Sequence, residues 1–157
     1  MAGPVLTVTV DGQTRIKVQL RRFSSAASDM RPGFERIADW FADEERRLFD
    51  SEGSAYPPGW PALSPRYADW KRRRVGNKPI LEFTGRLRRS LTRRPFGQEF
   101  ISRNTMTVGT DVPYARYHQR GTGNLPRRPP LIKQNRAVKT RLTKMLQEHL
   151  LAEMERA

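Results

Sequence analysis

The side chain best suited to acid–base chemistry in this sequence is His118, which lies among arginines and tyrosines. A metal-free ribonuclease could use such a histidine as general acid and base, with an arginine and a tyrosine holding the phosphate. A two-metal nuclease needs clustered carboxylates, but those between positions 60 and 145 are scattered: Asp69, Glu82, Glu99 and Asp111. We favour a simpler interpretation, in which the half-buried imidazole of His118 is hydrogen-bonded to a backbone group near Gly121. We therefore expect that the protein is not an enzyme.

Cofactor and metal sites are equally poorly supported. The sequence Gly121-Thr122-Gly123 lacks the lysine and hydroxyl residue that complete a phosphate-binding loop. The chain has no cysteine, which excludes disulfides and thiolate zinc sites. No apolar run approaches the roughly 20 residues that span a bilayer, and no signal-peptide pattern opens the chain. We therefore expect no cofactor, no metal and no membrane contact.

A short helix is expected directly after residues 81–83. Thr84 is a suitable N-cap residue before Gly85. Leu87 and Leu91 lie four positions apart and so share one face of this helix, with Ser90 on another. The two leucines are thus candidates for the core.

A second short helix is expected around His118. Tyr114 and His118 are four positions apart and would stack on one side of it. Gly121 can adopt the left-handed conformation that commonly ends a helix. We expect Tyr114, His118 and Gln119 to fasten this helix to a sheet and to leave an outward surface for a neighbour.

The first 22 residues predict a β-hairpin. Leu6, Val8 and Val10 alternate with threonines, Asp11-Gly12 could form a tight turn, and apolar residues alternate again over 16–20. Such a ribbon is marginal alone. The sequence does not decide whether it is an edge of the domain's own sheet or an arm that joins a neighbouring subunit.

The remaining pattern predicts a single α+β domain over residues 1–157, with a core over 23–157. Amphipathic helices are expected at 32–51 and 133–154, and Ser64 is a suitable N-cap for a short helix that starts at Pro65. Two strands are expected around residues 100–108, closed by Gly109 and Thr110, so that a small antiparallel sheet packs with the helices. Trp60 could cap the core or anchor a partner, and we favour burial.

The formal charge of +14 is concentrated in one block. Residues 60–145 carry 21 basic and 4 acidic groups, whereas residues 1–59 carry 8 and 9. Arginine, which makes up 24 of the 30 basic residues, suits fork-like pairing with phosphate or carboxylate. The block therefore predicts a polyanion or an acidic protein face as a partner, unless it is only a solvated surface.

Taken together, these motifs resemble the virion morphogenesis (tail-completion) family of tailed bacteriophages. The resemblance covers roughly residues 30–135 and depends on the order of its parts. They are Gly59-Trp60, Leu63-Ser64, Tyr67, Lys71, Leu81, Thr84-Gly85-Arg86-Leu87, Ser90, Val108-Gly109-Thr110, Tyr114-Ala115, Tyr117-His118-Gln119, Gly121 and Arg128-Pro129. This chain departs from the family in having Pro130-Leu131 where an aromatic residue commonly follows the Arg-Pro pair.

The resemblance implies a structural protein of the virion, made in the host cytoplasm, that completes the tail or joins it to the head at the neck. It implies a ring of copies and contacts with other tail, neck or head proteins. The signature residues, Trp60, Thr84, Gly85, Leu87, Ser90, Gly109, Thr110, Tyr114, His118, Gln119, Gly121 and Arg128, would then hold the fold or an interface between subunits.

The arginines after Thr84 are the candidate contacts with an anionic partner. We expect Arg86, Arg88, Arg89, Arg93 and Arg94 to face the acidic helix of a neighbouring copy, with its Asp39, Asp43, Glu44 and Glu45. The alternative function is a nucleic-acid-binding module, in which the same arginines track phosphates. Transient contact with DNA is compatible with both.

Overall fold

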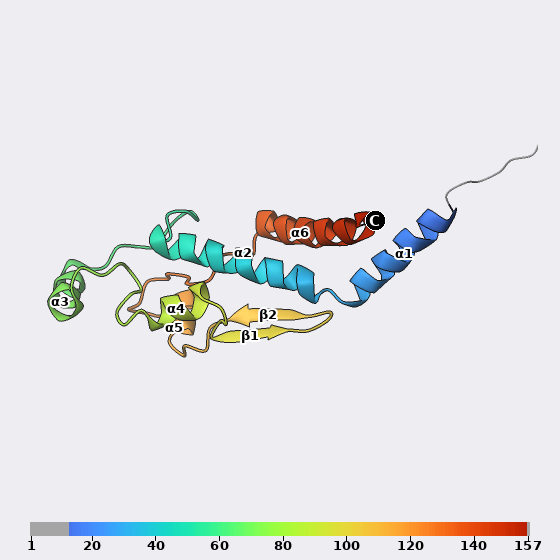
Figure 1. The fold of residues 1–157 in the computed structure, drawn as a ribbon. Helices are drawn as coiled ribbons and strands as arrows, with labels where there is room; N and C mark the ends of the chain where they lie inside the picture. The colour runs from blue at the N-terminus through green and yellow to red at the C-terminus, as the bar shows by residue number, and fades with distance from the viewer. Residues whose placement is uncertain (1–12, 157) are drawn as a thin grey trace, which may run out of the picture.

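The computed structural model describes residues 13–156, which form six helices and one pair of antiparallel strands (Figure 1). In chain order they are α1 (Gln13–Ser28), α2 (Arg31–Asp50), α3 (Pro65–Val75), α4 (Arg86–Thr92), β1 (Gln98–Ile101), β2 (Met106–Gly109), α5 (Ala115–Arg120) and α6 (Arg136–Glu155). The predicted α+β class is confirmed. The molecule is elongated, with α3 at one end and α1 at the other.

The long helix α2 is the spine of the fold. Helix α6 runs along one side of it, while α4 and the strand pair pack on another (Figure 1). Its predicted apolar stripe is confirmed, since Ile37, Leu48 and Phe49 are buried. Pro32 lies in the first turn, where its missing N–H costs no helical hydrogen bond.

The predicted N-terminal hairpin is wrong in the part that the structure describes. Residues 13–28 form α1, so the expected second strand over residues 16–20 is helical. Ile16, Leu20 and Phe23 also follow the i, i+4, i+7 spacing of a helix face, and three alternating apolar residues were too few to exclude it. The expected first strand and the Asp11-Gly12 turn lie outside the described residues.

The predicted pair of strands in the basic block is confirmed. β1 and β2 are antiparallel, with Gln98 opposite Gly109 and Ile101 opposite Met106. The end of this hairpin is tied to α4, because the hydroxyls of Ser90 and Thr110 are 2.6 Å apart and the Gly97 N–H donates to the Ser90 carbonyl oxygen at 2.9 Å. These bonds account for two of the predicted signature residues.

Three small cores join the elements around α2, and one of them, around Phe96, packs α2 against the strand pair. The other two lie near the C-terminal end of α2. In one, Phe49 of α2 packs with Leu87 and Leu91 of α4, which confirms the shared face of the two leucines, and with Val112 and Ala115. In the other, Leu48 packs with Ile132 and Val138. Helix α6 begins three residues later than predicted, where the Asn135 side chain accepts a hydrogen bond from the Val138 N–H at 2.9 Å.

Glu45 is the chief exception to the predicted acidic surface of α2. Its side chain is fully buried, and Oε1 accepts a hydrogen bond from the Ile132 N–H at 2.9 Å. Oε2 has no hydrogen-bond partner among the described residues. Burial raises the pKa of Glu45 to about 8. The expectation that Glu45 faces a neighbouring copy is therefore wrong, because the residue secures the chain before α6.

Candidate functional site

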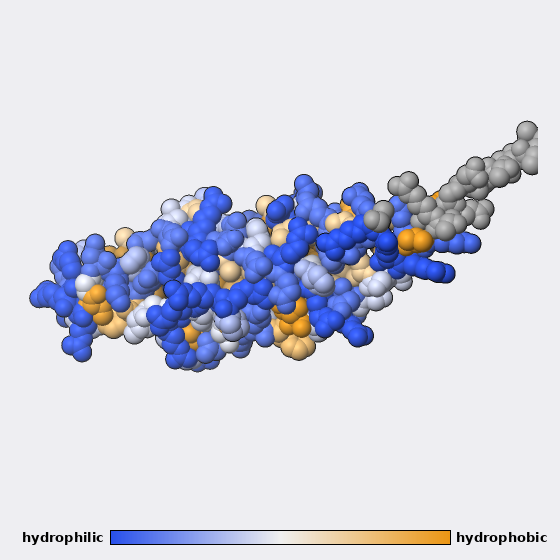
Figure 2. Space-filling view, viewed as in Figure 1, coloured by the Kyte–Doolittle hydropathy of each residue, from blue (hydrophilic) through white to orange (hydrophobic). Residues whose placement is uncertain are grey.

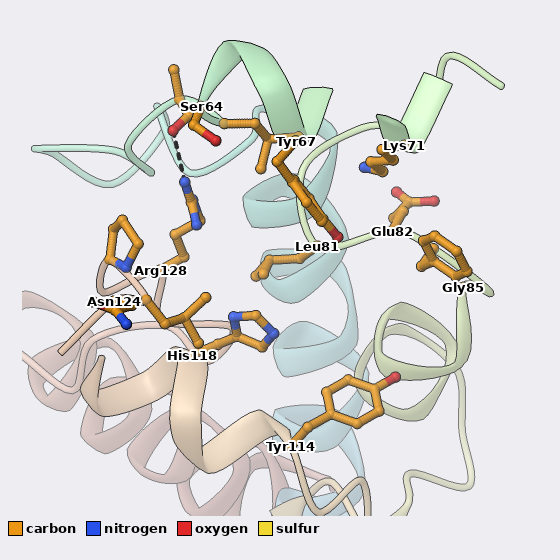
Figure 3. Close-up of a pocket in the computed structure, with 15 residues that line it drawn as sticks. Ser64, Tyr67, Lys71, Leu81, Glu82, Gly85, Tyr114, His118, Asn124 and Arg128 are labelled. Carbon is orange, nitrogen blue, oxygen red and sulfur yellow. Dashed lines mark hydrogen bonds between the residues drawn. The ribbon is translucent and has the colours of Figure 1, made fainter. Parts of the chain in front are cut away.

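A groove of about 520 Å³ lies where four segments of the chain meet. Its walls come from residues 62–71, residues 81–85, the start and middle of the α5 region, and the loop 124–128. Tyr67, Leu81 and His118 project into it from three of these segments (Figure 3). Leu63, Leu125 and other aliphatic residues line the rest, so the groove combines apolar walls with a few polar groups, as ligand sites generally do.

Four predicted signature residues line this groove: Gly85, Tyr114, His118 and Arg128. Gly85 has a φ of +76°, a left-handed conformation that glycine adopts at no steric cost. It is the N-cap residue of α4, and Thr84, the predicted N-cap, lies one position earlier. Thr84 Oγ1 nevertheless accepts a hydrogen bond from the Arg86 N–H at 3.3 Å, so it supports the same helix start.

Two other signature residues, Trp60 and Gln119, hold the segment 129–131 that follows the groove loop. We expected Trp60 to be buried, and it is half-buried. Its ring packs edge-on against Phe49 with centroids 5.3 Å apart. Its Nε1 donates to the Pro129 carbonyl oxygen at 2.9 Å. Gln119 Oε1 accepts from the Leu131 N–H at 3.4 Å. Both bonds hold the loop that carries Arg128.

Arg128 is a buried cation that joins two walls of the groove. Its Nε donates to the Pro61 carbonyl oxygen at 2.6 Å. Its Nη2 donates to the Ala62 carbonyl oxygen at 2.7 Å, the bond drawn in Figure 3. Its backbone N–H donates to the His118 carbonyl oxygen at 2.9 Å. Burial lowers the pKa of Arg128, and within the described residues carbonyl dipoles, not a carboxylate, solvate the charge.

Lys71 repeats this arrangement on the opposite wall. The residue is only 4% exposed, and Nζ donates to the Lys78 carbonyl oxygen at 2.8 Å and to that of Pro79. Burial lowers its pKa, against the attraction of Glu52 and Glu82. Glu82 also lines the groove, but its carboxylate accepts from Arg88 at 2.6 Å. The charged groups of the groove are therefore mainly positive.

His118 is half-buried, as predicted, but the predicted hydrogen bond to its imidazole is not found at Nδ1. That nitrogen is buried without a partner among the described residues. The Tyr114 ring packs edge-on against the imidazole with centroids 6.2 Å apart. The two rings therefore meet on one side of α5 as predicted, but they are not stacked. Burial lowers the pKa of His118, and the positive charge of Arg128 lowers it further. Gly121 ends the helix with a φ of +76°.

Three exposed aromatic rings form a row at the rim of the groove. Tyr67 stacks on Trp70 with centroids 5.4 Å apart, and Trp70 stacks on Phe83 at 5.8 Å. They are 45%, 49% and 36% exposed. Figure 2 shows apolar surface among hydrophilic side chains at this α3 end of the molecule. We call Tyr67, Trp70 and Phe83 the aromatic row. Contiguous exposed rings of this kind mark interaction surfaces.

The predicted anionic-partner arginines mostly have partners within the chain. Arg94 pairs with Glu35, with Asp39 at 2.9 Å and with Glu99. Its hydrogen bond to Glu99 lowers the pKa of that carboxyl.

The other four arginines differ in what they contact. Arg88 binds Asp50 as well as Glu82, and Arg86 lies 3.3 Å from Asp111. Arg89 donates to the Thr84 carbonyl oxygen at 3.1 Å. Arg93 is exposed. We expected these arginines to pair with acidic residues on α2 of a neighbouring copy. One such pair, Arg94 with Asp39, instead forms within a single subunit.

The sequence did not single out the α3 wall as functional. Tyr67 and Lys71 were noted only as parts of the family resemblance. Trp70 and Phe83 were not predicted to be site residues. A usable signal was present, since Tyr67, Trp70 and Lys71 fall on neighbouring positions of one helix face and three arginines follow. The contact of this face with Phe83 and the loop 124–128 depends on long-range packing.

Residues 13–156 show neither a metal-binding cluster nor a membrane-spanning helix. Among them, His, Asp and Glu side chains form no group of three or more that could hold a metal ion. No helix in this range is both long enough and apolar enough to cross a membrane.

Comparison with known proteins gives one family. Residues 11–151 match the model of the phage virion morphogenesis family. Neither the curated proteins nor the solved structures include a significant match. The family match spans nearly the whole chain, including α1 and most of α6, and so extends beyond the region of 30–135 that the sequence motifs covered.

Proposed function

Because this chain belongs to the phage virion morphogenesis family, we propose that it is a structural subunit that completes the tail or joins it to the head at the neck. In this proposal it acts as a ring of copies, contacts other tail, neck or head proteins, and catalyses no reaction. The observation that carries the proposal is that the two ends of the elongated molecule expose different apolar surfaces.

The first surface is on α1. Ile16, Leu20 and Phe23 lie on one face of this helix and are 52%, 58% and 38% exposed. We call them the α1 stripe. The helix packs on α6, and its partly covered residues, Gln19, Arg22 and Ala26, lie next to this stripe. An amphipathic helix normally buries its apolar face, so a stripe that faces outward supports contact with another subunit.

The second surface is the groove with its aromatic row, at the opposite end of the molecule. A subunit with two different contact surfaces can join two different neighbours. Contacts between copies close into rings when the rotation between subunits allows it, and the α1 stripe is a surface that can contribute to them. This arrangement supports an assembly of several copies or a position between two kinds of virion protein.

Nucleic-acid binding remains the second candidate, and one surface favours it. Arg136, Lys139 and Lys144 lie with two threonines along a shallow hollow on α6. A DNA-binding module should retard duplex DNA at low salt and lose affinity steeply as salt rises. Transient contact of this kind would also suit a neck subunit, because DNA passes through the neck.

The proposal is tested by the mass and the attachment of the purified protein. We expect light scattering to give a defined oligomer, or sedimentation to recover the protein with isolated tails or filled heads. Leu20→Ser should reduce the mass or the attachment, because it places a hydroxyl in the α1 stripe. Leu151→Ser, which changes a leucine that is 55% exposed on α6, is the matched control. A monomer that binds neither particle, and binds duplex DNA tightly at low salt, would favour the second candidate.

A further inference from the structure

The groove holds two buried cations without a carboxylate partner of their own within the described residues. Lys71 and Arg128 are each 4% exposed, and each donates to two backbone carbonyl oxygens. Both cations have more N–H donors than these bonds use. The carboxylate among the lining residues, Glu82, is bound by Arg88. The groove therefore presents a positive potential that is screened little by solvent.

The same groove can accept an apolar side chain, because the Leu81 side chain projects into it. The backbone of Leu81 has a φ of +62°, a conformation that non-glycine residues rarely adopt and that is concentrated at functional sites. The aromatic row extends the apolar surface outward from Tyr67 to Phe83. A partner that fills the groove would cover Leu81 and the row together.

We propose that the groove binds an extended acidic segment of another virion protein, which seats an aliphatic or aromatic side chain beside Leu81 and the aromatic row and places carboxylates near Lys71 and Arg128. This inference rests on the proposed function and names the partner chemistry of its second contact surface. The α1 stripe of another copy is disfavoured as the occupant, because α1 contains four basic residues and no acidic one. Like charges would meet in the groove.

A nucleic acid fits the groove less well than a peptide. Bases bind proteins by stacking on free aromatic faces, whereas in the aromatic row the rings of Tyr67, Trp70 and Phe83 already cover one another. Aliphatic walls suit a leucine or phenylalanine side chain better than the polar edges of a base.

The test is selection of random dodecapeptides by mRNA display on the immobilised full-length protein, followed by affinity measurement of the enriched peptides by fluorescence anisotropy. We expect the enriched peptides to combine Asp or Glu with Leu, Phe or Trp. Replacing their acidic residues by Asn and Gln should weaken binding by about tenfold or more. Trp70→Ser and Phe83→Ser should weaken it similarly, because both rings lie at the rim and their loss leaves the buried core intact.

Phe100→Ser is the matched control, since Phe100 is 60% exposed on β1 and does not line the groove. Circular dichroism checks that every variant is folded. Lys71→Met provides a charge test at the groove, and it should reduce the preference for acidic peptides.

Three results would overturn the proposal. They are enrichment of no peptide, enrichment of peptides without acidic residues, and binding that Trp70→Ser and Phe83→Ser leave unchanged. Competition by a twenty-nucleotide oligothymidylate with the same sensitivity to these variants would assign the groove to single-stranded DNA instead.

A complementation experiment separates failure of this inference from failure of the proposed function. We expect the Trp70→Ser, Phe83→Ser double variant to fail to restore infectious particles in a phage that lacks the protein, whereas Phe100→Ser restores them. If the double variant restores them fully, the groove has no role in assembly, although the assembly function stands. If the phage needs no complementation, the proposed function itself is wrong.

Discussion

Replacement of Glu45 by glutamine should remove much of the pH dependence of stability. The wild-type carboxyl is buried, accepts one hydrogen bond from the Ile132 N–H through Oε1, and leaves Oε2 unpaired among the described residues. A neutral, protonated carboxyl fits such a site, whereas a carboxylate would lose its hydration without a cation to replace it. In Glu45→Gln the amide oxygen can still accept from Ile132, but the side chain cannot ionise.

The magnitude follows from the two pKa values of Glu45. Burial raises the pKa from 4.5 to about 8 in the folded protein. The folded state therefore binds more protons than the unfolded state between these pH values, so that stability falls as the pH rises through this interval. At ~1.4 kcal/mol for each pH unit, the wild type should lose roughly 3 to 4 kcal/mol through Glu45 between pH 5 and pH 8.

Urea unfolding followed by tryptophan fluorescence, at pH 5, 6, 7 and 8 and constant protein concentration, measures this effect. The free energy of unfolding of Glu45→Gln minus that of the wild type should rise by roughly 3 to 4 kcal/mol from pH 5 to pH 8. Asp43→Asn is the control, because the Asp43 side chain is 70% exposed and pairs with the exposed Arg46. This change should leave the slope unaltered. A difference that stays constant across this range would refute the reasoning on Glu45.

Two further predictions concern the packing around α4. Leu91→Ala should lower the free energy of unfolding by about 2 to 5 kcal/mol, because the side chain is fully buried between α4 and α2. The control, Leu151→Ala, should change it by less than about 0.5 kcal/mol. Urea unfolding measures both. Gly97→Ala should cost about 1 to 3 kcal/mol, because its Cβ would lie 2.7 Å from the Asp111 backbone nitrogen. Gly123→Ala, where a Cβ would meet no atom within 4 Å, should be near neutral, and equal melting temperatures for the two glycine variants would contradict this explanation.

Local patterns predicted the regular elements well where they were long or carried strong end signals. The apolar spacing over residues 32–51 corresponds to α2, and the alternation near residues 100–108 corresponds to the β1–β2 pair. The spacing of Tyr114, His118 and Gly121 predicted α5 and its end. The hairpin prediction failed over residues 13–22, because its short alternation also fits one face of a helix.

Long-range polar contacts could not be predicted from local pattern. Glu45 looked like one more acidic residue on an exposed helix face, and only its bond to Ile132, 87 positions away, explains its burial. Arg128 looked like part of a basic loop, yet it binds carbonyl groups 66 and 67 positions earlier. Charge counting also missed that Arg94 contacts acidic residues of its own chain. The groove depends on such contacts, so the sequence indicated some of its residues, such as His118 and Arg128, without indicating their convergence.

Electron microscopy of particles made by a phage that lacks this protein can decide whether it acts in virion assembly. We expect DNA-filled heads beside separate tails, or tails of abnormal length, and restoration of complete virions by the wild-type gene supplied in trans. Complete, infectious virions formed in its absence would contradict the account.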